Sequence, residues 1–121
     1  MNVSYHGQGE NYAEAVVAGE EIYLSGLVSE DLTTGELKKG TIEEETEQIM
    51  QNMKVILEKY GSSMDKLIRV EIFMTDFSER VRMNKVYASH FDPQRIPSRV
   101  CVGCTGLYEG CRVEMLAHAY R

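Results

Sequence analysis

The chain has 121 residues, of which 43% are hydrophobic and 26% are charged, a composition typical of one globular domain spanning residues 1–121. No apolar run approaches the roughly 18 residues needed to cross a bilayer, and the chain begins with a polar segment rather than a secretion signal, so we expect a cytoplasmic protein. The formal net charge of −6 disfavours nucleic acid as a partner, because phosphate binding needs a basic surface.

The first third of the chain predicts two strands joined by a tight turn. Residues 1–11 are polar and are expected to form a loop or a loose edge strand. Residues 14–18 and 21–28 have the apolar, β-branched character of strands, with Gly19 and Glu20 between them as the turn. Gly26 interrupts the second strand, which indicates either a bend or the close approach of another group.

A long helix is predicted from residue 41 to residue 60. Thr41 and Glu44 have the spacing of a capping box, and acidic residues crowd the first turns, where they suit the helix dipole. Apolar side chains recur at helical spacing along the segment. Gly61 is expected to end the helix in a left-handed conformation.

The next segment predicts a central strand followed by a second helix. Residues 67–75 alternate, and this pattern places Ile68, Val70, Ile72 and Met74 on the face toward the first helix. Asp76 or Ser78 is expected to cap a helix over residues 79–91, with an apolar side formed by Val81, Met83, Val86, Tyr87 and Phe91. Asn84 lies in the middle of this helix, where the pattern alone predicts an exposed side chain.

The stretch IPSRVCVGCTGLYEGCRVEM, residues 96–115, is interpreted as two strands joined by a turn, forming a final hairpin. Arg99 and Cys101 share one face of the first strand, and Glu114 lies on the second. A charge on an interior strand needs a partner or a purpose, because burying an unpaired charge is costly. The pattern leaves two interpretations open: a structural Arg99–Glu114 pair, or a site in which Arg99 binds an anion and Glu114 handles protons or water.

The predicted order is β-β-α-β-α-β-β, an α+β fold in which a mixed sheet carries two helices on one face. The other face would be uncovered and would hold a mixture of apolar and charged side chains: Tyr23, Phe73, Cys101, Leu116, Arg69, Glu71, Arg99 and Glu114. Such a face is too apolar for water and too polar for a closed core. We therefore expect an oligomer interface, with the polar groups lining a cleft between subunits.

The cysteines and histidines give little indication of a metal site. Cys101 and Cys104 have the spacing of a metal or redox pair, but positions three apart on a continuing strand face opposite ways unless a bulge intervenes. Three cysteines without a secretion signal argue against a disulfide framework, and the three histidines lack ligand spacing with one another.

Taken together, these segments resemble the YjgF/RidA family, also called the reactive intermediate deaminase family or, in older usage, endoribonuclease L-PSP. The resemblance runs from about residue 11 to residue 120, and residues 96–115 are its most specific part. Supporting matches are YAEAVVAGEEIYLSGLV, the TGEL turn, EEETEQIMQNMKVILEKYGSSMDKLIRVEIFMTDF and MNKVYASHF.

The resemblance implies a fold similar to chorismate mutase of the bacterial AroH type and a homotrimer with clefts between neighbouring subunits. It implies that Arg99 binds the carboxylate of a small enamine or imine acid and that Glu114 orients or activates the attacking water. It places Tyr12, Ser25, Gly26, Asn84 and Cys101 in the pocket, Cys101 as a lining residue rather than a nucleophile. It implies no metal and no organic cofactor.

The resemblance predicts a deaminase that hydrolyses 2-aminoacrylate or 2-iminobutyrate to 2-keto acids and ammonia, as a 2-iminobutanoate/2-iminopropanoate deaminase does. The alternatives are a non-catalytic trimer that binds 2-keto acids and an endoribonuclease, the latter opposed by the negative charge and by the absence of a His/Lys cluster. The chain departs from the family at Glu10-Asn11, at residues 27–30, at Val100 and in a shortened loop over residues 92–97, so the substrate stays open.

Overall fold

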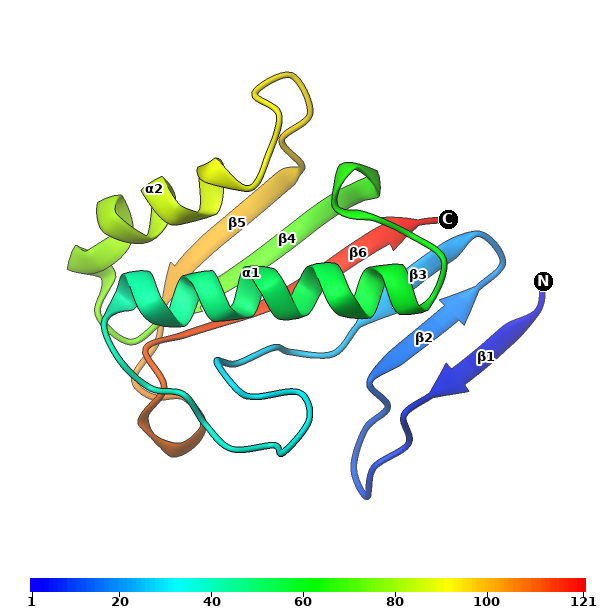
Figure 1. Cartoon of the computed structure of the whole chain (residues 1–121), viewed down its shortest axis with the longest axis horizontal. Helices are drawn as coiled ribbons and strands as arrows, with labels where there is room; N and C mark the ends of the chain where they lie inside the picture. Colours follow the sequence, from blue (N-terminus) through cyan, green and yellow to red (C-terminus); the bar gives the residue numbers. More distant parts are fainter.

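The computed structural model describes residues 1–121 as six strands and two helices (Figure 1). Three short 3-10 turns, Met64–Lys66, Phe77–Glu79 and Tyr108–Gly110, connect them. Neither helix is both long and apolar enough to cross a membrane. The elements in chain order are β1 (Val3–His6), β2 (Ala15–Ala18), β3 (Glu21–Leu24), α1 (Ile42–Lys59), β4 (Leu67–Met74), α2 (Arg80–Ser89), β5 (Ser98–Gly103) and β6 (Val113–Tyr120).

The boundaries of α1 are those that its end residues predict. The Thr41 hydroxyl accepts a hydrogen bond from the Glu44 N–H at 3.2 Å, and the Glu44 carboxylate accepts one from the Thr41 N–H at 2.9 Å, which completes the capping box. Gly61 follows the C-cap with φ at +85°, a conformation that costs a residue with a Cβ more than it costs glycine. Local chemistry therefore sets both ends of this helix.

The strands form one sheet in the order β1-β2-β3-β6-β4-β5. All neighbours are antiparallel except β4 and β5, which run parallel. The predicted fold class, a mixed sheet with two helices on one face, is confirmed. Residues 1–11, for which the sequence allowed either a loop or an edge strand, contribute β1. The predicted final hairpin is wrong, because β4 lies between β5 and β6.

Both helices pack on one face of the sheet, and the core lies between them and the strands (Figure 1). Alternate side chains of β6 are buried on this face, as predicted: Val113, Met115, Ala117 and Ala119. On β4 the alternation is broken by a bulge between Leu67 and Arg69, so Leu67 is buried and Ile68 is exposed, contrary to the prediction. Val81 is likewise exposed rather than part of the apolar side of α2.

The face opposite the helices is uncovered in the single chain. Tyr23, Arg69, Glu71, Leu116 and His118 surround a shallow hollow of about 190 Å³ on it. The rings of Tyr23 and His118 stack at 4.1 Å across β3 and β6. An apolar and charged surface of this kind is therefore present, as the sequence predicts.

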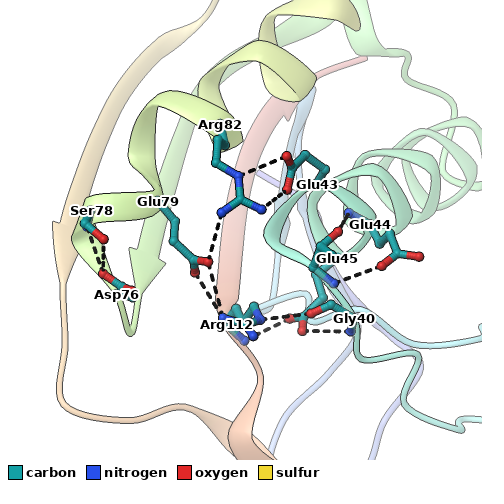
Figure 2. Close-up of polar contacts among 10 residues, drawn as sticks. Gly40, Glu43, Glu44, Glu45, Asp76, Ser78, Glu79, Arg82 and Arg112 are labelled. Carbon is teal, nitrogen blue, oxygen red and sulfur yellow. Dashed lines mark hydrogen bonds and ion pairs between the residues drawn. The ribbon is translucent and has the colours of Figure 1, made fainter.

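A polar network fixes the start of α1 against the start of α2 and the entry to β6 (Figure 2). Glu45, which is buried, accepts hydrogen bonds from the backbone N–H groups of Gly40 at 3.2 Å and Arg112 at 2.8 Å. The Arg112 Nε donates to the Gly40 carbonyl at 2.9 Å, and its Nη1 lies 3.3 Å from Glu79. This network holds the strand that carries Glu114 in a fixed position relative to both helices.

Candidate functional site

A hollow of about 580 Å³ lies where the segment after β3 passes the start of β6. Its lining includes four of the predicted site residues, together with others that the sequence did not single out: Tyr12, Ser25, Gly26, Val28, Glu30, Gly35, Tyr108 and Glu114. Two backbone hydrogen bonds between Leu27 and Met115, at 2.7 and 3.0 Å, join the two segments. This pairing brings Gly26 alongside Glu114.

Gly26 leaves the space that the Glu114 carboxylate occupies. A Cβ built on Gly26 would lie 2.5 Å from Oε2 of Glu114 and 3.0 Å from its Cδ. Of the two interpretations of this glycine, the close approach of another group is the one that the structure supports. The Glu114 carboxylate has no hydrogen-bond partner and no ion-pair partner in the chain, and burial raises its pKa.

Ser25 holds the rim of the same hollow. Its hydroxyl donates to the Ala13 carbonyl at 2.6 Å, and its N–H donates to the Glu14 carbonyl at 3.1 Å. These bonds fix the segment that carries Tyr12, whose side chain is 68% exposed at the hollow. The Ser25 oxygen keeps acceptor capacity for a ligand.

The other three predicted residues form a separate cluster between β5 and α2. The Arg99 Nη1 donates to the Asn84 Oδ1 at 2.8 Å, and the guanidinium carbon lies 5.0 Å from the centre of the Tyr87 ring. Asn84 is therefore a partner of Arg99 rather than the freely exposed side chain that the helix pattern alone predicts. Cys101 shares the face of Arg99, and burial raises the pKa of its thiol, which favours a lining role over a nucleophilic one.

Arg99 retains most of its capacity to bind an anion. Only one of its five N–H donors is used, and no carboxylate lies within 4.0 Å of it. The Tyr87 ring that supports it is 3% exposed, its hydroxyl has no hydrogen-bond partner, and burial raises the pKa of Tyr87 to about 12. The support is therefore a neutral aromatic face, which leaves the charge of Arg99 uncompensated.

Arg99 and Glu114 do not meet within one chain. Arg99 and Cys101 pair with the buried residues Val70 and Ile72, so they lie on the helix-covered side of the sheet, whereas Glu114 pairs with Phe73 on the open side. Two strand spacings, roughly 10 Å, also separate β5 from β6. The prediction that Arg99 and Cys101 share the uncovered face with Glu114 is wrong, and so is the alternative of a structural Arg99–Glu114 pair.

The described groups include no candidate metal centre. No three His, Cys, Asp or Glu side chains lie close enough together to hold a metal ion. Cys101, Cys104 and Cys111 are all free thiols.

Comparisons with known proteins identify the family. Residues 7–121 match the sequence model of the family described as Endoribonuclease L-PSP. The chain belongs to this family, YjgF/RidA. A RutC family protein of Pyrococcus horikoshii is 36% identical over 110 residues, which are 91% of this chain and 86% of the relative.

Another YjgF/RidA relative carries the name of an activity. The protein named 2-iminobutanoate/2-iminopropanoate deaminase from Dermatophagoides farinae is 34% identical over 104 residues, or 86% of this chain and 80% of the relative. The crystal structure of yeast Mmf1 superposes with a TM-score of 0.90 at 29% identity and covers 99% of both chains. Deaminases therefore occur among the relatives of this chain, alongside relatives that are named only by family.

Three residues of the hollow and of the Arg99 cluster were not predicted from the sequence: Glu30, Tyr87 and Tyr108. The helix pattern predicts Tyr87 only as part of the apolar side of α2, although Tyr87 lies three residues after Asn84 and so shares its face. Glu30 and Tyr108 line the hollow with Glu114. Glu30 belongs to the segment that departs from the family, which was the available signal.

Proposed function

We propose that this YjgF/RidA chain is a deaminase that hydrolyses small reactive 2-imino acids and their enamine tautomers to 2-keto acids and ammonia. The reaction would take place in a cleft between copies of the chain, arranged as a homotrimer. In that cleft Arg99, Asn84 and Cys101 of one copy would face Glu114, Tyr12, Ser25 and Gly26 of the next. We also propose that the protein works in the cytoplasm without a metal or organic cofactor.

The observation that carries the proposal is the division of the charged groups into two incomplete halves. One half offers a guanidinium with free donors and no carboxylate beside it, and the other offers the Glu114 carboxylate in a hollow that has no Lys, Arg or His side chain. Because the halves lie on opposite sides of the sheet, a second copy is needed to bring them together. The open sheet face, with Tyr23 and Val102 exposed on it, provides a surface for such a copy.

The chemistry requires placement and proton handling rather than a strong nucleophile. Arg99 would hold the substrate carboxylate through paired N–H donors, which fixes the imine carbon. Glu114, with its raised pKa, would accept a proton from water as the water oxygen bonds to that carbon, and would return a proton to the nitrogen. In the carbinolamine so formed, Glu114 would take the proton of the new hydroxyl group and deliver it to the nitrogen. The C–N bond then breaks, ammonia leaves, and the C=O bond of the 2-keto acid forms.

The test combines an activity assay with complementation between variants. An amino-acid oxidase generates 2-iminopropanoate or 2-iminobutanoate in place, and 2-keto acid and ammonia formation are followed above the buffer rate. Arg99→Ala and Glu114→Gln should each lose the acceleration. If each cleft takes its two halves from different copies of a ring, unfolding and refolding the two inactive variants together should restore about a quarter of the wild-type sites.

Two results would overturn the proposal. If folded wild-type protein does not exceed the buffer rate but binds pyruvate in a manner dependent on Arg99, the protein is a binding module rather than an enzyme. If mixed variants stay inactive although mass spectrometry shows mixed oligomers, the site does not draw its halves from neighbouring copies.

A further inference from the structure

A second carboxylate, that of Glu30, lines the same hollow as Glu114. Glu30 is held in place through its backbone: it forms a bridge with Leu37, and its carbonyl accepts a hydrogen bond from the Nδ2 of the buried Asn52 at 2.8 Å. Its carboxylate, by contrast, has no hydrogen-bond donor and no ion-pair partner in the chain. The fold therefore fixes the residue while leaving its charged group free.

The hollow around Glu30 suits a cation. Its lining contains two carboxylates and no Lys, Arg or His side chain. It also contains the rings of Tyr12 and Tyr108, which are 68% and 63% exposed and can present their faces to a positive group. Burial raises the pKa of the Glu30 carboxyl, and the nearby charge of Glu14 raises it further.

The charges of the assembled cleft do not balance with a substrate that is only an anion. Arg99 of a neighbouring copy would supply one positive charge, which the substrate carboxylate would take. Glu30 and Glu114 would then each line the cleft without a counter-charge, and burial already disfavours the ionised form of both. A positive group on the substrate itself removes this cost at the Glu30 end.

We propose that Glu30 is a specificity-determining residue and that the preferred substrates are 2-imino acids whose side chain ends in a cationic group, a guanidinium or an ammonium. This inference rests on the proposed function and narrows its substrate class. The side chain would extend from the reacting carbon beside Glu114 toward Glu30, between the two tyrosine rings. A hollow of about 580 Å³ has room for a side chain of this length.

The test uses two substrates that differ in charge but hardly in shape. An amino-acid oxidase converts arginine and citrulline into the corresponding 2-imino acids, whose side chains end in a guanidinium and a neutral urea group. For wild-type protein we expect kcat/KM to be about tenfold or more higher with the arginine-derived imine, the usual value of a hydrogen bond to a charged group. In Glu30→Gln the ratio of the two values should fall to within about twofold of unity.

The matched control is Glu36→Gln, which makes the same charge change at an exposed position on the same loop, outside the hollow. It should keep the wild-type ratio. A wild-type enzyme that accelerates both reactions without preference, or a preference unchanged in Glu30→Gln, overturns the role of Glu30 and leaves the deaminase proposal standing.

Binding measurements separate the two proposals in the opposite case. If neither imine is turned over faster than in buffer, calorimetry with the 2-keto acids of arginine and citrulline takes the place of kinetics. Tighter binding of the arginine product, lost in Glu30→Gln and kept in Glu36→Gln, supports cation selection although the deaminase proposal fails. Equal binding of the two products, or no binding of either, refutes cation selection by Glu30.

Discussion

Gly26→Ala tests whether the position of the Glu114 carboxylate is set by the space that Gly26 leaves. The added Cβ would lie 2.5 Å from Oε2 of Glu114, so the carboxylate must move by about 0.9 Å to reach an ordinary contact distance of 3.4 Å. The atoms that clash are at the end of a flexible side chain rather than in the backbone. The φ angle of Gly26 also lies outside the left-handed region, so alanine can adopt the backbone conformation.

We expect Gly26→Ala to lower the activity but to change the stability little. A displacement of about 1 Å in a reacting group can lower the rate about 100-fold, which is about 2.7 kcal/mol in the barrier. We therefore expect kcat of Gly26→Ala to fall by about 10-fold to 100-fold, with KM changed less, because the substitution leaves the proposed anion-binding group, Arg99, in place. The free energy of unfolding should change by less than about 1 kcal/mol.

The assay measures 2-keto acid formation from 2-iminobutanoate, and urea unfolding measures stability. Gly106→Ala is the matched control, because a Cβ at Gly106 meets no atom within 4 Å, and it should behave as wild type. Full activity in Gly26→Ala, with activity lost in Glu114→Gln, would refute the link between this gap and catalysis. A large loss of stability in Gly26→Ala would show instead that the local backbone conformation requires glycine at this position.

Three further predictions concern residues outside the hollow. Tyr87→Leu removes the ring under Arg99 and should raise KM about 3-fold to 30-fold, whereas Tyr87→Phe keeps the ring and should have a KM within about twofold of wild type. Equal KM values for the two variants would exclude a contribution of stacking on Arg99. Glu45→Ala leaves two backbone N–H groups unpaired and should lower the free energy of unfolding by about 2–5 kcal/mol in urea titrations. Burial tends to raise the pKa of Glu14, but hydrogen bonds, chiefly from Tyr60, outweigh burial and lower this pKa. The ionised Glu14 should therefore stabilise the fold fully above the ordinary carboxyl pKa, and this contribution should vanish as the pH falls through the lowered pKa. Glu14→Gln should remove this pH dependence from the thermal unfolding temperature.

Features that depend on neighbouring residues could be predicted from the sequence. The ends of α1 follow from the Thr41 capping box and from Gly61, because each involves contacts within a few residues along the chain. The buried face of β6 follows from its alternation, because successive side chains of a strand point to opposite sides. The resemblance to known proteins similarly identifies the family and the candidate site residues.

The placement of the candidate site depended on information that local patterns lack. Alternation shows that Arg99 and Val100 point to opposite faces of β5, but either face could be turned toward the helices. The structure turns Arg99 toward α2, where the ring of Tyr87 covers its guanidinium and leaves it partly exposed. The bulge at Ile68 could not be predicted for the same reason, because it depends on how β4 pairs with β6.

The sequence by itself determined both helices, most of the strands, the residue types available for chemistry and the family of this chain, because these depend on side-chain identity and short-range spacing. Only the tertiary structure decided that β4 separates β5 from β6 and that the guanidinium and the carboxylate lie on opposite sides of the sheet. Strand order and the choice of buried face follow from which arrangement buries the most apolar surface across the whole fold, a quantity that no single segment contains.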